Sequence, residues 1–421
     1  MRFADIFAGL GGFHVAAASL GGKCVFACEI DETLRRLYQA NFGMLPARDI
    51  CEVDPADVPA HDLLCAGFPC QPFSKAGYQK GLKDRRRGSV LFSIPQILKK
   101  RQPGYIILEN VAHFVRHDKG RTYEKVKRAL ECAGYEVAVH EYSPHQFGIP
   151  QIRNRIYLVG KLGHLNGFKW PEPPENPPDL CLRRVLDENP PDAKPISSHV
   201  VDCLEVWQEF LQSFPKDGKL PSFPIWSMEF KATYPFTKYD SLHKVAVSRL
   251  WNLRGCFGRS LRTHFRHELL ARVPSHARAA RNAFPRWKQL FIRQNRQLYR
   301  EHRIWIDQWL PRIQRFPPSL QKLEWNCQGE KRNIWKYVIQ FRASSVRVKR
   351  PNTAPSLVAM TTSQVPIIGW ERRYMTTREC ARLQSMGSLK HLPTGVDAVR
   401  AFGNAVNVDV VRGILERLLN S

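Results

Sequence analysis

Short apolar runs and amphipathic stretches alternate over roughly the first 160 residues, and this alternation limits the possible fold more than any other feature. The apolar runs predict strands at Arg2–Ala8, Lys23–Ile30, Asp62–Phe68, Tyr105–Asn110, Tyr135–Tyr142 and Arg155–Lys161. The stretches between them predict helices at Phe13–Leu20, Glu32–Asn41, Val90–Arg101 (interrupted at Pro95) and Thr122–Ala133. Such alternation is typical of an α/β fold with a mainly parallel sheet that helices cover on both faces.

The composition changes after this region. Eight prolines between Trp170 and Pro195 predict a stiff connecting segment at a domain boundary. The following segment is rich in tryptophan, and Arg254–Arg303 holds thirteen Lys or Arg against two acidic residues. A closing helix is expected at Asp397–Asn420. We therefore expect one domain made of residues 1–166 and 396–421, with a smaller basic module inserted at 167–395.

The net charge of +26, with a pI near 9.9, is the strongest compositional feature. A field of one sign this large favours a polyanionic partner, most simply nucleic acid. No apolar run is long enough to cross a bilayer, and the N-terminus begins a strand pattern without the layout of a signal peptide. Eleven cysteines without metal-ligand spacing indicate reduced thiols in the cytoplasm and no metal site.

Three motifs follow predicted strands. The first is the glycine-rich turn Phe7-Ala8-Gly9-Leu10-Gly11-Gly12. The second, Pro69-Cys70-Gln71, follows the third strand, and a cysteine between a proline and a polar residue at a strand end is typical of a nucleophile in a fixed position. The third, Glu109-Asn110-Val111, follows the apolar run of the fourth strand. A single short motif often occurs by chance, so the information lies in all three motifs following predicted strands in this order.

The glycine-rich turn predicts a nucleotide site. Glycines between a strand and a helix let a ligand approach backbone N–H groups at the helix N-terminus. Glu29 ends the second strand eighteen residues past Gly11, a spacing that suits a carboxylate on ribose hydroxyls. These residues fit either a nicotinamide dinucleotide or S-adenosyl-L-methionine.

As a whole the chain resembles the cytosine-C5 DNA methyltransferases of bacterial and phage type. The matching segments stand in the order that this family uses: Asp5–Gly12, Ala27–Asp31, Asp62–Ser74, Glu109–Val111, Gln151–Arg155, Arg350–Met360, Arg378–Met386 and Gly403–Val406. The resemblance implies a Rossmann-like methyltransferase domain of α/β class with an inserted target-recognition domain and hinge. It also implies transfer of a methyl group to C5 of a flipped-out cytosine in a short duplex DNA site.

The resemblance assigns the catalytic roles. Cytosine C5 is a weak nucleophile, and a thiolate that adds to C6 turns C5 into an enamine carbon. Cys70 would be this thiolate, and Glu109 would hold cytosine N3 with a carboxyl whose pKa is raised. Arg153 and Arg155 alternate along an extended segment, so they share a face. The resemblance places them at the flipped base and its phosphate and in support of the catalytic centre.

The methyl donor implied by the resemblance is S-adenosyl-L-methionine. The residues it would contact are Phe7, Gly9, Leu10, Gly11 and Gly12 at the methionine part, Glu29 at the ribose, Ile30, Asp49 and Ile50 at the adenine, and Pro69, Asn404 and Val406 around the rest of the pocket. Double-stranded DNA is the expected partner, bound by a monomer, with a restriction endonuclease as a possible functional counterpart. The expected location is the cytoplasm, on the nucleoid.

Three alternatives remain at this point. A tRNA cytosine-C5 methyltransferase would share Cys70 and Glu109, but the Cys-Phe-Thr signature of that branch is absent. A non-catalytic DNA-binding protein would not need those two residues. A nicotinamide oxidoreductase would explain the glycine turn but neither Cys70 nor the charge.

Overall fold

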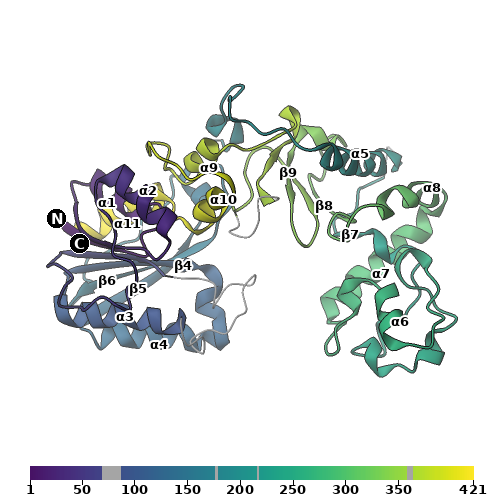
Figure 1. Ribbon diagram of the computed structural model, residues 1–421, viewed down its shortest axis with the longest axis horizontal. Helices are drawn as coiled ribbons and strands as arrows, with labels where there is room; N and C mark the ends of the chain where they lie inside the picture. Colours follow the sequence, from purple (N-terminus) through teal and green to yellow (C-terminus); the bar gives the residue numbers. More distant parts are fainter. Residues whose placement is uncertain (69–86, 176–178, 216–217, 358–363) are drawn as a thin grey trace. The chain divides into compact units, whose positions relative to one another are not determined.

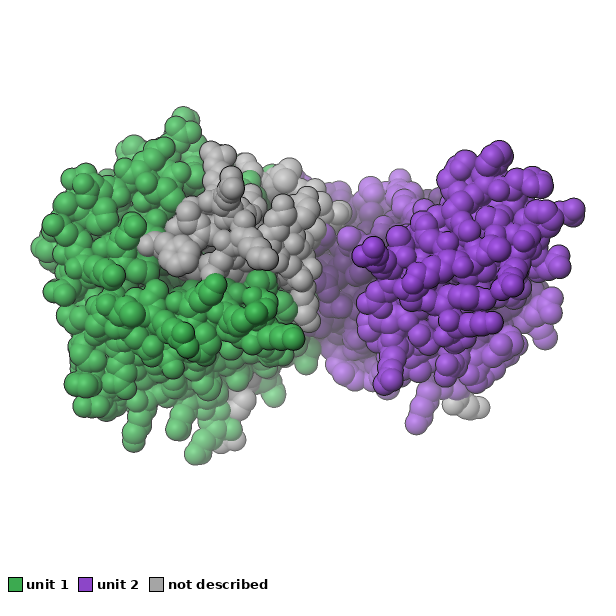
Figure 2. Space-filling model, turned by 90° about the horizontal axis from the view of Figure 1, so that it is seen from below, with its two compact units in different colours: residues 1–192, 352–362, 375–421 green, residues 193–351, 363–374 purple. Residues whose placement is uncertain are grey.

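The computed structural model describes residues 1–68, 87–175, 179–215, 218–357 and 364–421. Its chain divides into two compact units, coloured separately in Figure 2. Unit 1 comprises Met1–Asp192, Asn352–Thr362 and Met375–Ser421, and unit 2 comprises Ala193–Pro351 and Ser363–Tyr374. Both ends of the chain thus belong to one unit.

Unit 1 is built around a six-stranded sheet in the order β2-β1-β3-β4-β6-β5. Its strands are β1 (Arg2–Ile6), β2 (Lys23–Cys28), β3 (Leu63–Gly67), β4 (Tyr105–Val111), β5 (Tyr135–Tyr142) and β6 (Arg155–Leu162). The pairs among β2, β1, β3 and β4 are parallel, whereas β6 runs antiparallel to both β4 and β5. The predicted α/β class with a mainly parallel sheet is confirmed.

Helices cover both faces of this sheet (Figure 1). The α-helices of unit 1 are α1 (Gly12–Ser19), α2 (Glu32–Phe42), α3 (Arg87–Arg101), α4 (Arg121–Glu131), α9 (Thr377–Leu383), α10 (Gly395–Asn404) and α11 (Val408–Leu419). In Figure 1, α1 and α11 lie on one side of the sheet and α3 and α4 on the other. The central strand β3 is buried throughout Leu63–Ala66, as its unbroken apolar sequence requires.

Two local predictions are wrong. Pro95 does not interrupt its helix, because α3 runs from Arg87 to Arg101 with Ile94, Ile97 and Leu98 fully buried against the sheet. This packing compensates for the single hydrogen bond that a proline removes. The closing helix is not continuous, since α10 ends at Asn404 and the Asn407 side chain caps a new helix by accepting from the N–H of Val410 at 3.1 Å.

Unit 2 contains a second six-stranded sheet in the order β12-β11-β9-β10-β8-β7. Its strands are β7 (Ile225–Trp226), β8 (Lys322–Asn326), β9 (Val338–Phe341), β10 (Val346–Lys349), β11 (Ile367–Ile368) and β12 (Arg373–Tyr374). Its helices are α5 (Ser198–Ser213), α6 (Arg266–Arg272), α7 (Arg286–Glu301) and α8 (Arg303–Gln314). Trp207, Trp309 and Trp325 belong to the buried core of this unit, so these tryptophans stabilise the fold.

The unit boundaries differ from those expected from the sequence. The first boundary falls after Asp192 rather than at 166/167, and Met375–Ser421 belongs entirely to unit 1. The proline-rich segment stays with unit 1 because its side chains and backbone bind there: Tyr142 donates to the Pro171 carbonyl at 2.6 Å, and Arg382 pairs with Asp187 at 2.8 Å.

Candidate active site

The glycine turn between β1 and α1 requires glycine for two physical reasons. Gly9 and Gly11 have φ values of 55° and 79°, and Phe7 shares this left-handed region with φ 59°. A Cβ on Gly11 would lie 2.3 Å from the Phe42 ring, and a Cβ on Gly12 would lie 2.6 Å from Val406. Leu10 is buried within the turn. The turn therefore presents bare backbone at the carboxyl end of β1.

Glu29 is fixed beside this turn. Its Oε2 accepts from the N–H of Gly9 at 2.9 Å, and its Oε1 accepts from the N–H of Asp31 at 2.9 Å. Burial raises the pKa of this carboxyl, while the backbone hydrogen bonds act in the opposite direction. Each carboxylate oxygen keeps further lone pairs, so Glu29 can still accept hydrogen bonds from two ligand hydroxyls.

The predicted adenine residues lie along the next stretch of chain. Ala47 pairs with β2 through hydrogen bonds to Ala27 and Glu29, which brings the 46–50 segment beside the end of that strand. Asp49 accepts from the N–H of Cys51 at 2.9 Å, and Ile50 is buried. Ile30, by contrast, is 65% exposed. An open apolar side chain next to Glu29 suits the face of a flat ring.

The C-terminal segment meets the glycine turn. Val406 is 5% exposed and borders the position of Gly12, whereas Asn404 is exposed at the end of α10. Pro69 and Cys70 lie outside the described residues. The structure thus brings together Gly12, Glu29 and Val406 from three distant parts of the sequence.

Glu109 occupies the second part of the site, at the carboxyl end of β4. It pairs in register with Gly67 of β3, and a Cβ added to Gly67 would lie 3.9 Å from Glu109 Oε2. The neighbouring Asn110, which is 1% exposed, donates to the Phe68 carbonyl at 3.2 Å. This bond joins the ends of β3 and β4 just before the sequence continues into Pro69-Cys70-Gln71.

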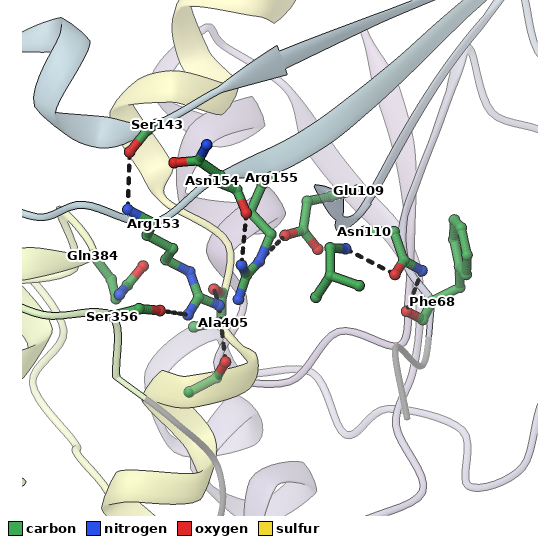
Figure 3. Close-up of polar contacts among 12 residues, drawn as sticks. Phe68, Glu109, Asn110, Ser143, Arg153, Asn154, Arg155, Ser356, Gln384 and Ala405 are labelled. Atoms are coloured by element: carbon green, nitrogen blue, oxygen red, sulfur yellow. Dashed lines mark hydrogen bonds and ion pairs between the residues drawn. The ribbon is translucent and has the colours of Figure 1, made fainter. Parts of the chain in front are cut away.

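Arg155 forms an ion pair with Glu109, with 2.9 Å between Nε and Oε1 (Figure 3). The Glu109 side chain is 7% exposed and that of Arg155 is 15% exposed. Burial raises the pKa of Glu109, although Arg155 and Arg153 both act to lower it. A carboxyl that keeps its proton to higher pH than usual can donate that proton at a reaction centre.

Arg153 is 2% exposed and its guanidinium binds backbone oxygens. Nη2 donates to the carbonyls of Gly403 and Ala405 at 2.8 and 2.9 Å, and Nη1 donates to the Leu357 carbonyl at 3.3 Å. The backbone N–H of Arg153 donates to Ser143 Oγ at 2.8 Å. Arg153 therefore connects the lead-in to β6 with the segment after α10 (Figure 3).

Several residues of this network are not found by sequence reasoning. Gln384 donates to Gln151 Oε1 at 3.0 Å, and Asn407 donates to the Leu383 carbonyl at 3.1 Å. Gln151, Gln384 and Asn407 are almost completely buried. Gln151 and Gln384 lie in two of the segments that carry the resemblance, but a single buried polar residue gives no periodic signal, and these two partners lie 233 residues apart.

Within the described part of the chain, no group of three His, Cys, Asp or Glu side chains could hold a metal ion. Likewise, none of the described helices is long and apolar enough to span a bilayer.

The sheet is Rossmann-like, the glycine turn lies beside a carboxylate at the end of the second strand, and a buried Glu–Arg pair lies at the end of β4. These features are typical of an enzyme that binds a cofactor containing a nucleoside. A sequence model described as C-5 cytosine-specific DNA methylase matches residues 1–223 and 256–420. The chain belongs to this family, whose members are methyltransferases that use S-adenosyl-L-methionine. The predicted family, enzyme class and cofactor are confirmed, and the nicotinamide oxidoreductase alternative is excluded.

Among curated relatives, the Type II methyltransferase M.AluI of Cellulosimicrobium cellulans is 29% identical over 98% of this chain and 91% of its own length. The Type II methyltransferase M.HhaI of Haemophilus parahaemolyticus is 42% identical over 52% of this chain and 67% of its own length. Of the solved structures, the methyltransferase EhMeth of Entamoeba histolytica superposes with a TM-score of 0.53 and 14% identity, covering 100% of this chain and 98% of that one. This structural likeness shows the fold.

Proposed function

We propose that this chain transfers a methyl group to C5 of a cytosine that is flipped out of a specific short site in duplex DNA. The observation that carries the proposal is the buried Glu109, paired with Arg155 and with its pKa raised, at the end of the strand next to β3. The sequence places Cys70 three residues past β3. Because the carboxyl ends of adjacent parallel strands lie at one edge of a sheet, we infer that Cys70 and Glu109 act in one site.

The proposed reaction begins when the Cys70 thiolate adds to cytosine C6. Glu109 donates its proton to N3 in the same step, so that the ring gains no net negative charge and C5 becomes an enamine carbon. Bound S-adenosyl-L-methionine supplies the electrophilic methyl group that C5 takes. A water molecule or hydroxide from solvent then takes the C5 proton and the Cys70 thiolate leaves C6, which restores the aromatic ring as N3 returns its proton to Glu109.

The residues around the glycine turn fit the methyl donor. Glu29 would accept from the ribose hydroxyls, Ile30 and Ile50 would flank the adenine, and Asp49 would accept from its amino group. The bare backbone of Gly9, Gly11 and Gly12 would lie against the methionine part, with Phe7 and Leu10. Pro69, Asn404 and Val406 would complete the pocket. The exposed Ile30 and the spare lone pairs of Glu29 support this arrangement.

Cytosine in a duplex hides C6 in the base stack, so the base must leave the stack to reach Cys70. We assign DNA binding to the inserted segment 167–395, most of which forms unit 2. The Type II names of the relatives support a role in a restriction-modification system. We further propose that the chain acts as a monomer on nucleoid DNA in the cytoplasm.

The test is transfer of a labelled methyl group from S-adenosyl-L-methionine into duplex DNA, followed by bisulfite sequencing to find the site. We expect one short sequence context to be methylated. Cys70→Ser should bind the same DNA and transfer nothing. Transfer to tRNA instead of DNA would support the RNA-directed alternative, and DNA binding without any transfer would support a non-catalytic role.

A further inference from the structure

Unit 2 contains a cavity of about 630 Å³ whose wall is dominated by cations. Six of the described residues that line it are basic and none is acidic; the six are Lys231, Arg254, Arg293, Arg296, Arg300 and Arg303. We propose that this cavity binds consecutive phosphates of a DNA strand and supplies affinity that does not depend on base sequence. The proposal rests on the DNA substrate proposed above and adds a binding site within the inserted segment.

Helix α7 presents the largest share of these cations. Its opposite face is buried through Ile292, Asn295 and Leu298. The Asn295 side chain fixes the helix, because Oδ1 accepts from the N–H of Trp226 at 2.7 Å and Nδ2 donates to the Pro224 carbonyl at 2.9 Å. Arg293, Arg296 and Arg300 are spaced by three and four residues, so they share the remaining face.

Arg296 is held rigidly at this wall. Its Nε pairs with the fully buried Glu229 at 3.0 Å, and its Nη1 donates to the Tyr234 carbonyl at 2.9 Å. The guanidinium also lies over the rings of Tyr234 and Phe236, at 4.3 and 4.8 Å from their centroids. Its Nη2 is buried and has no hydrogen-bond partner within the described part of the chain. A cation fixed in this way is prepared for an anion without loss of side-chain freedom on binding.

The other cations are only partly neutralised. Asp307 serves both Lys231 at 2.8 Å and Arg303 at 3.4 Å, and it also accepts from the Tyr299 hydroxyl. Considering described residues only, Arg254, Arg293 and Arg300 form no ion pair. Several like charges around one cavity repel one another in the free protein, and a bound anion relieves that repulsion.

The size of the cavity and the number of cations favour a repeating anion. Cavities of about 300–1,000 Å³ hold molecules of drug size, so this one has room for more than a single phosphate group. The Arg254 backbone is fixed at the wall, because its carbonyl accepts from Thr233 and Tyr234. Phosphate contacts of this kind position a protein on DNA without reading its sequence.

The test compares two double variants with the same loss of charge. Arg293→Gln with Arg300→Gln removes the two α7 cations that line the cavity and form no ion pair with a described residue. Arg281→Gln with Arg286→Gln is the control, since both residues are exposed and neither lines the cavity. Affinities are measured over a range of salt concentrations for two duplexes, one containing the methylation site and one lacking it. Thermal melts verify that all proteins are folded.

We expect the cavity variant to lose affinity for both duplexes by the same factor, roughly 60-fold at 0.1 M salt for two phosphate contacts. The slope of log affinity against log salt should become shallower by about 2. The rate of methyl transfer at saturating DNA should stay at the wild-type value. The control variant should change the affinity and the salt slope much less.

Equal losses in the two variants would overturn the proposal, because the general field of the surface would then explain binding. A loss confined to the duplex with the site would also overturn it, in favour of base reading. Tighter binding of the wild type to duplex RNA, with the same response to the cavity substitutions, would replace DNA by RNA as the partner. Failure of the proposed function is a separate outcome, in which wild-type protein transfers no methyl group to DNA.

Discussion

Replacing Arg153 by alanine should destabilise unit 1, because its buried guanidinium binds three backbone carbonyls. The guanidinium makes two short hydrogen bonds, to the carbonyls of Gly403 and Ala405, and a longer one to Leu357. A hydrogen bond from a charged donor contributes about 1.5–3 kcal/mol, and each buried carbonyl left without a donor costs about 1–3 kcal/mol. Water entering the vacated space recovers part of this loss. We therefore expect unfolding free energy to fall by about 3–5 kcal/mol.

The assay is thermal unfolding with and without S-adenosyl-L-methionine. Since a ligand that binds the folded state raises its melting temperature, the transition that the ligand shifts identifies unit 1. At about 2–4 °C per kcal/mol for a unit of this size, Arg153→Ala should lower that transition by roughly 10 °C. Arg116→Ala is the control, because Arg116 is 76% exposed and pairs with Glu141 only at 3.7 Å. Its effect should stay below about 0.5 kcal/mol.

Arg153→Lys separates charge from geometry. Lysine keeps the positive charge but cannot extend two N–H groups to two carbonyls, so its loss should be intermediate. A melting temperature of Arg153→Ala within about 2 °C of the wild type, a shift below about 1 kcal/mol, would show that these hydrogen bonds do not stabilise unit 1.

Two further predictions concern the turn and the carboxyl. Gly11→Ala combines a left-handed φ with a Cβ 2.3 Å from Phe42, so it should lower the free energy of unfolding by about 2–4 kcal/mol in a denaturant titration. Gly43→Ala is the control, because Gly43 has φ 74° but open space around the added Cβ, and it should lower that free energy by about 1–2 kcal/mol. Similar losses in the two variants would show that the contact with Phe42 contributes nothing. Because burial raises the pKa of Glu109, kcat/KM should fall as pH rises through that raised pKa, and Glu109→Gln should be about 10²–10⁴-fold slower at its optimum. Between the ordinary and the raised pKa the folded state holds a proton that the unfolded chain has lost, so stability should decline with rising pH, and Glu109→Gln should remove this slope. A stability that rises with pH in this window would mean that Arg155 outweighs burial.

The sheet of unit 1 could be predicted from the sequence because its strands are short, apolar and regularly separated by helices. All six predicted strands of unit 1 are present, and so are its four N-terminal helices. The glycine turn and Glu29 could also be placed, because the turn chemistry and the strand end are both local signals.

The interactions that assemble the site could not be predicted in this way. Arg153 binds carbonyls more than 200 residues later in the chain, and a backbone carbonyl leaves no mark in the sequence. The break between α10 and α11 was missed because the apolar pattern continues through Val406, while only the cap by Asn407 marks the new helix. The wrong prediction at Pro95 has the opposite cause, because the packing of α3 on the sheet outweighs the local helix-breaking effect of proline.

The basic character of the inserted segment was visible in its composition, but its arrangement was not. Arg293, Arg296 and Arg300 could be placed on one face of a helix. That Arg296 is fixed by Glu229 and by two aromatic rings depends on residues scattered over more than sixty positions. Three-dimensional packing alone distinguishes a built cavity from a solvated basic surface.

The proposed covalent bond between Cys70 and cytosine C6 can be trapped and identified. Duplex DNA carrying 5-fluorocytosine at the methylated position is incubated with the protein and S-adenosyl-L-methionine. The protein is then digested, and the masses of its peptides are measured by mass spectrometry. Fluorine at C5 cannot leave as a proton, so we expect a stable adduct on the peptide containing Cys70 and no adduct in Cys70→Ala. An adduct on another residue, or methyl transfer that persists in Cys70→Ala, would contradict the proposed role of Cys70.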